Sequence, residues 1–159
     1  MAPERRKSQT PEHHACKAAI ADALSIFQLI EEGLRIYLDN AYHVIERSIG
    51  DRMVIRLTIK SLQYGSLRRL LDEFRKYSGN VKLISKLEKL IPQRNSLAHQ
   101  AFLEMYRTTL KRNDLIKLTK QAKNIHGKAY ECSGLLETEI DMIAKLYDEV
   151  SDDSKSGKR

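Results

Sequence analysis

The chain is poor in the residues and segments that mark β-rich, disulfide-held or membrane-spanning proteins. It has no Trp, three Pro and seven Gly among 159 residues, and this scarcity of turn-forming residues favours long helices over a β fold. Its two cysteines, Cys16 and Cys132, give no disulfide framework, and we expect both to be reduced thiols. No apolar run approaches the length of a membrane span, and the N-terminal stretch MAPERRKSQT lacks the apolar core of a secretory signal. We therefore expect a cytoplasmic protein that makes no contact with membranes.

The composition is that of a globular protein with an excess of basic residues. Hydrophobic residues make up 42% and charged residues 31% of the chain, so one domain of this length can bury a core without metal or disulfide support. The formal net charge is +7, and part of the excess lies at the two ends. A mildly basic body permits polyanion binding without demanding it. We expect disordered tails at 1–9 (basic) and 151–159, around a single helical domain at 10–150.

Apolar residues at spacings of three and four predict a set of long helices. The first is expected over about 11–48, because Thr10-Pro11-Glu12 is typical of a helix start. The others are expected over about 61–77, 81–109 and 114–150; residues 52–62 favour a strand locally, but a lone strand has no partner, so we expect a loop there. Pro92 should kink the third helix or begin a new first turn. The predicted fold is all-α, an antiparallel bundle of four to five helices.

The segment RNSLAH, residues 94–99, carries the densest group of chemically useful side chains. Arg94 falls on the apolar stripe of its helix, where an unpaired charge is costly, so it needs an acidic partner or a phosphate. Asn95 and His99 are four residues apart and therefore share a helix face. Metal-free RNA cleavage needs a proton acceptor, a proton donor and a fixed cation beside the phosphate, and histidine and arginine suit these roles. One segment holds a single histidine, so two copies of the chain would be needed to supply both acid and base.

RNSLAH, followed by Gln100-Ala101-Phe102, resembles the R-x4–6-H signature of HEPN domains, with the polar residue that usually follows the arginine. The stretches SLQYGSLRRLLDEF (61–74) and ISKLEKLIPQRNSLAH (84–99) are similar to the family's helices before and at the motif, so recognisable residues span about 61–102. The resemblance implies a HEPN-like bundle, a homodimer whose two motifs face one cleft, and a metal-independent endoribonuclease without cofactors. Arg94, Asn95 and His99 match the family's arginine, polar residue and histidine.

The resemblance also bears on partners. Many HEPN proteins belong to toxin–antitoxin, abortive-infection or other defence systems, so an antitoxin or regulatory protein is a candidate partner besides RNA. One subgroup, paired with a nucleotidyltransferase antitoxin, carries a tyrosine two residues after the histidine. Here that position is Ala101, so the resemblance gives no support for that partner.

Several residues around the motif are weaker candidates for a role at the site. Glu31 could pair with Arg94 across the bundle and orient it, or with Arg35 on its own helix surface. Lysines 82, 86 and 89 line one face that leads to the motif and could guide RNA, as could the basic residues of 68–76, although solvated surface charge is the simpler interpretation. A base-stacking role for Tyr106 competes with a place in the core. No metal site is expected, because the group at His13, His14 and Cys16 lacks a fourth ligand.

The sequence therefore favours an endoribonuclease in which His99 is the acid or base. In this interpretation Arg94 stabilises the phosphorane-like transition state, Asn95 orients the phosphate or His99, and the product carries a 2′,3′-cyclic phosphate. Two alternatives stay open: a non-catalytic helical module that dimerises or binds a protein, and a regulator that binds RNA without cutting it.

Overall fold

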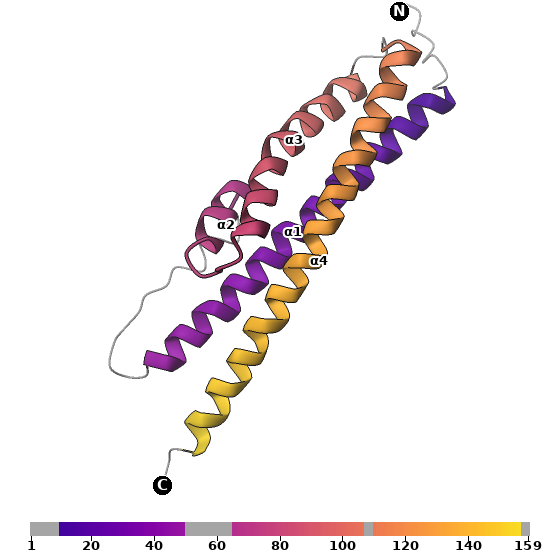
Figure 1. Cartoon of the computed structure of the whole chain (residues 1–159). Helices are drawn as coiled ribbons and strands as arrows, with labels where there is room; N and C mark the ends of the chain where they lie inside the picture. Colours follow the sequence, from indigo (N-terminus) through magenta and orange to yellow (C-terminus); the bar gives the residue numbers. More distant parts are fainter. Residues whose placement is uncertain (1–9, 50–64, 107–109, 157–159) are drawn as a thin grey trace, which may run out of the picture.

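The protein folds into four packed helices, shown in Figure 1. The structure, a computed structural model, describes residues 10–49, 65–106 and 110–156, without the side chains of 102–106 and 152–156. The helices are α1 (Pro11–Ile49), α2 (Leu67–Phe74), α3 (Val81–Tyr106) and α4 (Arg112–Ser156). Within these described ranges there is no strand. The all-α class and the packing of four helices are thereby confirmed.

The two longest helices, α1 and α4, lie side by side and run in the same direction (Figure 1). Near their first residues Arg112 Nε lies 2.8 Å from Glu12 Oε1, and near their last turns Arg47 Nη2 donates to Tyr147 Oη at 2.7 Å. In contrast, α3 runs opposite to α4, since Asn80 at its start bonds Glu139 and Lys86 further along bonds the earlier residue Glu131.

The parallel arrangement of α1 and α4 corrects the prediction of an antiparallel bundle. Helix α2 has eight residues and α1 has 39, so α2 spans roughly 12 Å against roughly 58 Å for α1. Because α2 cannot return the chain along α1, α3 makes the return, and α4 then runs beside α1 in the same direction. The antiparallel prediction holds for α3 against its long neighbours and is wrong for the α1–α4 pair.

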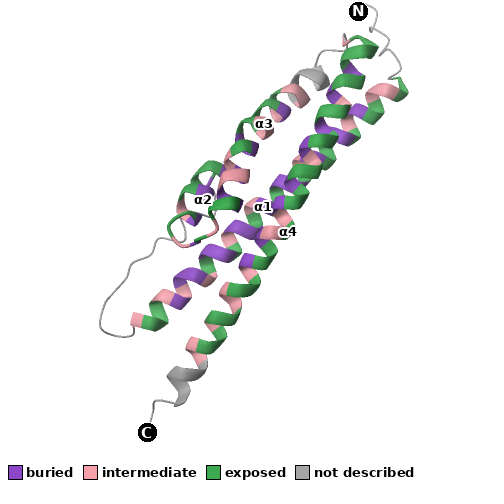
Figure 2. Cartoon of the chain, in the orientation of Figure 1, coloured by how far each residue is buried: buried purple, intermediate pink, exposed green. Residues whose placement is uncertain are grey.

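The core lies between the facing stripes of α1 and α4, and α2 and α3 close it on one side (Figures 1 and 2). The apolar residues Phe27, Leu34, Leu87 and Ile125, which recur at helical spacings, are among the fully buried side chains. Gly33 is also buried, and a Cβ atom there would lie 2.8 Å from Leu136 Cδ2. The missing side chain therefore lets α1 approach α4 closely, and α1 continues through this glycine without interruption.

Side-chain hydrogen bonds define the starts of two helices. Asn80 Oδ1 accepts from the backbone N–H of Leu83 at 2.9 Å, as a cap before α3. Ser66 Oγ accepts from the backbone N–H of Arg69 at 3.5 Å and begins α2 later than the predicted 61. Pro92 lies inside α3, so no new helix begins there.

The last helix is longer than predicted. It begins at Arg112 and extends to Ser156, so it includes 151–156, which we expected to belong to the C-terminal tail. Between Gly134 and Gly157 the sequence has no glycine or proline, and Arg47 bonds both Tyr147 and Ser151, which holds this end of α4 against α1. The predictions for 1–9, 52–62 and 107–109 lie outside the described residues.

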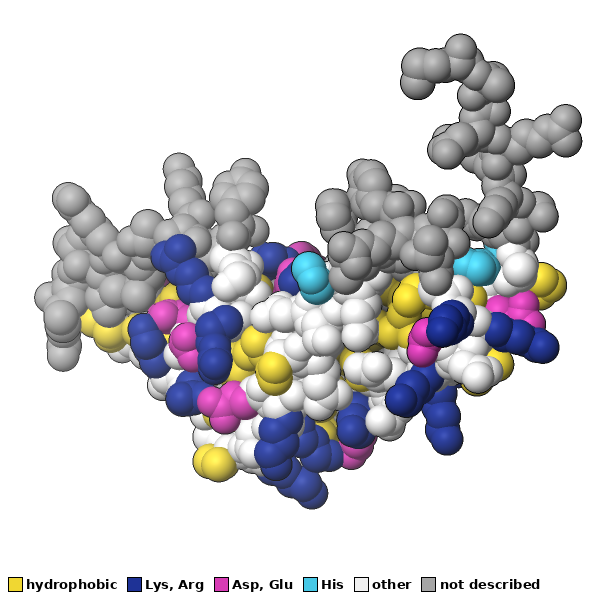
Figure 3. Space-filling view, turned by 90° about the horizontal axis from the view of Figure 1, so that it is seen from above, with side chains coloured by type: hydrophobic (Ala, Val, Ile, Leu, Met, Phe, Trp, Pro, Cys, Tyr) yellow, Lys and Arg dark blue, Asp and Glu magenta, His cyan; other side chains and the backbone are white. Residues whose placement is uncertain are grey.

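The surface reflects the basic composition. Figure 3 shows Lys and Arg side chains spread over the face seen from above, with fewer Asp and Glu among them. None of the described helices combines the length and apolar character that a bilayer crossing requires.

Candidate functional site

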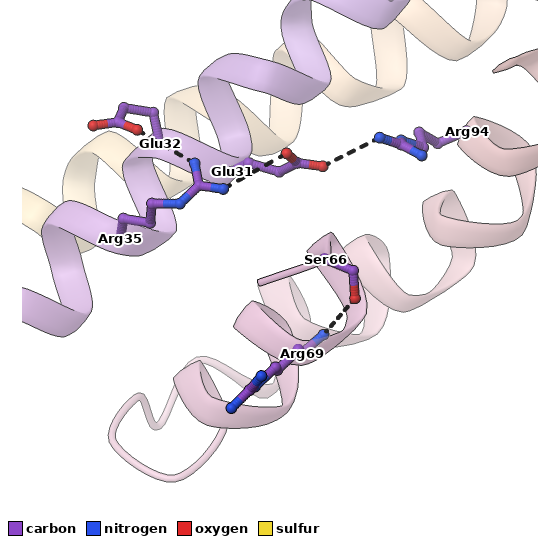
Figure 4. Close-up of polar contacts among 6 residues, drawn as sticks. All are labelled: Glu31, Glu32, Arg35, Ser66, Arg69 and Arg94. Atoms are coloured by element: carbon purple, nitrogen blue, oxygen red, sulfur yellow. Dashed lines mark hydrogen bonds and ion pairs between the residues drawn. The ribbon is translucent and has the colours of Figure 1, made fainter. Parts of the chain in front are cut away.

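Arg94 reaches from α3 to α1, where it meets an acidic residue (Figure 4). Its Nη2 lies 3.5 Å from Glu31 Oε1, and its Nη1 donates to Asn95 Oδ1 at 3.4 Å. The Arg94 side chain is 38% exposed and that of Glu31 is 16% exposed. The guanidinium at this stripe position therefore has the acidic partner that its partial burial requires.

Glu31 also contacts an arginine of its own helix. Its Oε2 lies 3.9 Å from Arg35 Nη2, while Arg35 Nη1 donates to Glu32 at 3.3 Å. The two pairings that the sequence left open for Glu31 thus occur together, with the carboxylate between two guanidinium groups (Figure 4). The Nε atoms of Arg35 and Arg94 are buried and have no hydrogen-bond partner among the described residues. The ion pairs therefore do not use all the donors of either arginine.

His99 lies on the exposed side of α3, one turn after Asn95, which is also exposed. Five residues along a helix correspond to a turn of about 140° and a rise of about 7.5 Å, so Arg94 and His99 do not share a face. The side chain of His99 forms no hydrogen bond or ion pair with another described residue. The structure therefore brings Arg94, Asn95 and Glu31 together and leaves His99 accessible on the outer face of the same helix.

The three predicted RNA-guiding lysines differ in their surroundings. Lys82 and Lys89 are exposed, whereas Lys86 is half-buried and forms an ion pair with Glu131 of α4. The hydrogen bond from Lys86, followed by its charge, holds the pKa of the Glu131 carboxyl below its usual value. The same bond raises the pKa of Lys86. Lys86 thus joins α3 to α4, whereas Lys82 and Lys89 form no ion pair with another described residue.

Three of the four basic residues of 68–76 are directed away from the motif or paired with acids elsewhere. Arg69 points away from the Glu31–Arg94 pair in Figure 4. Arg75 is paired with Glu88 and Lys76 with Glu73, the latter at 2.6 Å. The side chain of Tyr106, the other predicted RNA contact, lies outside the described residues.

A buried carboxylate in α4 is a feature that the sequence interpretation missed. Glu139 is 9% exposed, and it accepts hydrogen bonds from Ser78 Oγ at 3.0 Å and Asn80 Nδ2 at 2.9 Å. Burial, followed by the charge of Glu139, raises the pKa of Tyr37 nearby. Glu139 stands on the apolar stripe between Leu136 and Ile140, and this position was the available signal. The network fixes the start of α3 against α4, and so helps to position the helix that carries the motif.

The N-terminal histidines have ordinary surroundings. His13 Nδ1 lies 2.8 Å from Thr10 Oγ1, and Cys16 is buried in the core. Nowhere in the described ranges do three or more His, Cys, Asp or Glu side chains gather as a metal ion would need.

The chain matches no family model, no curated protein and no solved structure. The HEPN resemblance therefore depends on residues 61–102 of this sequence alone.

Proposed function

We propose that this chain is a metal-independent endoribonuclease of the HEPN type, acting in the cytoplasm as a homodimer, in a toxin or defence role. The observation that carries the proposal is the arrangement along α3. Arg94 is held by Glu31 and contacts Asn95, and His99 lies accessible on the outer face of the helix.

The proposed chemistry divides between these side chains. His99 takes the proton from a ribose 2′-OH, or donates one to the leaving 5′ oxygen. Arg94 stabilises the charge that develops on the phosphate, because a guanidinium held in place needs little reorganisation as the reaction proceeds. Its ion pair with Glu31 restricts the guanidinium, and the 38% exposure of the Arg94 side chain leaves it accessible to phosphate oxygens. Asn95 orients the phosphate or His99.

We propose a homodimer because the reaction needs both a proton acceptor and a proton donor. Cleavage needs one group to accept a proton and another to donate one, and each copy offers a single histidine in the motif. Two motifs that face one cleft would supply both. Measuring the molecular mass in solution tests this requirement, since a strict monomer that still cleaves RNA would exclude the shared cleft.

The decisive experiment is cleavage of a mixed RNA pool in EDTA. The parent should cut, and the His99→Ala variant should lose about 10²–10⁴-fold in rate. We expect Arg94→Ala to lose about 10²–10³-fold, since it removes the fixed cation. His126→Ala, which changes a histidine on α4, is the matched control and should cut like the parent. Equal cutting by all four proteins would mean that the activity belongs to another site or to a contaminant.

The alternative of a non-catalytic interaction module has one structural observation in its favour. Large apolar side chains are exposed on the two longest helices, among them Leu29 at 63%, Ile36 at 44% and Tyr130 at 67%. Such side chains suit a helical protein partner or a second copy. A folded dimer that cuts no RNA would favour this module, whereas a salt-sensitive RNA complex without cutting would favour the RNA-binding regulator.

A further inference from the structure

Two hollows follow one another along the groove between α3 and α4. The first, of about 260 Å³, is lined by Lys86, Lys89, Leu90, Gln93, Lys128, Glu131 and Cys132. The second, of about 220 Å³, is lined by Gln100, Leu110, Asp114, Lys117, Leu118 and Gln121. Because α3 and α4 are antiparallel, later residues of α3 face earlier residues of α4, so the two hollows lie one after the other along the α3–α4 contact, which we call the α3–α4 groove. The second hollow includes the residue directly after His99.

The rim of this α3–α4 groove is basic. Four lysines line the two hollows against two acids, Glu131 and Asp114. Glu131 is already neutralised by its ion pair with Lys86. In the described part of the chain, Lys89, Lys117 and Lys128 have no acidic partner. The groove therefore presents an excess of positive charge that a polyanion would complement.

The floor of the groove differs from its rim. Leu90, Cys132 and Leu118 are buried apolar side chains, and amide side chains stand beside them. The Oε1 atom of Gln100 is buried and accepts no hydrogen bond from any described residue. An unsatisfied buried acceptor is costly, and Gln100 lines the second hollow, so a ligand donor that meets its amide after the side chain rotates toward the hollow would be favoured. The lysines at the rim suit the phosphates of a ligand. The apolar side chains and the amide acceptor below them suit flat rings that carry N–H groups.

We infer that the α3–α4 groove binds single-stranded RNA, with phosphates on Lys89, Lys117 and Lys128 and a base edge at Gln100. A single strand can turn its bases into the hollows, whereas a duplex keeps its bases stacked and paired. Amides and apolar contacts in the hollows then add to the charge that follows the backbone. This inference rests on the proposed function in one respect: the strand bound here runs to His99 beside Gln100.

The test is the affinity of a fluorescently labelled single-stranded RNA, measured in EDTA by anisotropy in a His99→Ala background that prevents cutting. The double substitution Lys89→Gln/Lys128→Gln should weaken binding at least about tenfold. It should also reduce the slope of log affinity against log salt by roughly 1.4, as expected for two lost phosphate contacts. Gln100→Ala should weaken binding in a base-dependent manner. The matched control Lys120→Gln/Lys123→Gln removes two lysines of α4 that line a hollow with α1 instead, and should bind more like the parent than the groove variant does.

Three results would overturn the inference. The first is an equal affinity of the groove variant and the control variant for the labelled RNA. The second is that an RNA duplex displaces the labelled RNA as well as unlabelled single-stranded RNA does. The third is that polyglutamate displaces it equally well, which would mean that the groove binds an acidic protein. Cleavage by the same variants with His99 restored separates this inference from the proposed function. Intact groove binding without any cleavage would contradict only the nuclease, and cleavage with unchanged affinity in the groove variant would contradict only the groove.

Discussion

Among single residues, Glu31 restrains the arginine of the motif, because its carboxylate contacts both Arg35 and Arg94. We predict that Glu31→Gln lowers kcat for RNA cleavage about tenfold, since an unpaired Arg94 samples more orientations. The free energy of unfolding should change by less than about 1 kcal/mol, because partly exposed ion pairs contribute little. The matched control is Glu32→Gln, which removes a carboxylate that contacts only Arg35 among these residues. An equal fall in kcat for both variants would exclude a specific role for Glu31.

Glu73 makes the stability depend on pH in the acid range. Its partial burial raises the carboxyl pKa, but hydrogen bonds from Lys76, Tyr42 and Tyr77 together lower it below the ordinary 4.5. The folded state therefore holds this proton less tightly than the unfolded state, so its stabilisation is complete above pH 4.5 and is lost as the pH falls below it. Denaturant unfolding at a series of pH values should show a steeper loss for the parent than for Glu73→Gln. Identical acid profiles would contradict this assignment.

Some contacts of single residues could be predicted from the sequence, and others could not. Arg94 and Glu31 lie on facing apolar stripes. From these positions the sequence predicts that Arg94 needs a partner and that Glu31 is one candidate. The Glu139 network could not be anticipated in the same way. Its donors, Ser78 and Asn80, lie in the connection between α2 and α3, and no helical period predicts where that connection folds.

At the scale of the helices, Asn80 has two functions, as the cap of α3 and as a donor to Glu139. We predict that Asn80→Ala lowers the free energy of unfolding by about 1–3 kcal/mol, because it leaves a helix N–H and a buried carboxylate oxygen without partners. Asn113→Ala removes an exposed amide in the first turn of α4 and should change stability by less than about 0.5 kcal/mol. Chemical denaturation of both variants measures the difference, and equal effects would contradict the proposed functions of Asn80.

Alanine substitutions at Gly33 in α1 and Gly127 in α4 test whether these two helices approach closely at Gly33. Gly127→Ala should stabilise the protein by about 0.5–1 kcal/mol, since a Cβ there meets nothing within 4 Å and alanine favours a helix. Gly33→Ala should stabilise less or destabilise, because its Cβ would lie 2.8 Å from the buried Leu136 side chain. Thermal or denaturant unfolding compares the two. A larger gain for Gly33→Ala than for Gly127→Ala would contradict the tight α1–α4 contact.

The helices themselves were largely predictable, and their directions were not. The apolar period and the caps predict α1 and the start of α3 closely. The same period overestimates α2, because Ser66 begins this helix late and the chain turns directly after Phe74. Because α2 is far shorter than α1, α3 is the helix that returns along α1, and α4 therefore runs parallel to α1.

In the whole molecule, the proposed cleavage requires two copies of the chain that bring two sets of Arg94, Asn95 and His99 to a single phosphate. One chain supplies the held guanidinium and the accessible imidazole, but only one titrating group for proton transfer in the motif. The fold class follows from composition and periodicity. The second copy is expected from the chemistry, since the reaction needs a proton donor and a proton acceptor at once.

The most direct test of this central claim is mass spectrometry of the ends that the protein leaves on a defined RNA oligonucleotide in EDTA. The account predicts 2′,3′-cyclic phosphate ends, no cutting of the same oligonucleotide with a 2′-deoxy sugar at the cleavage position, and loss of these ends with His99→Ala. Products with 3′-hydroxyl and 5′-phosphate ends, or cutting at the 2′-deoxy position, would contradict it.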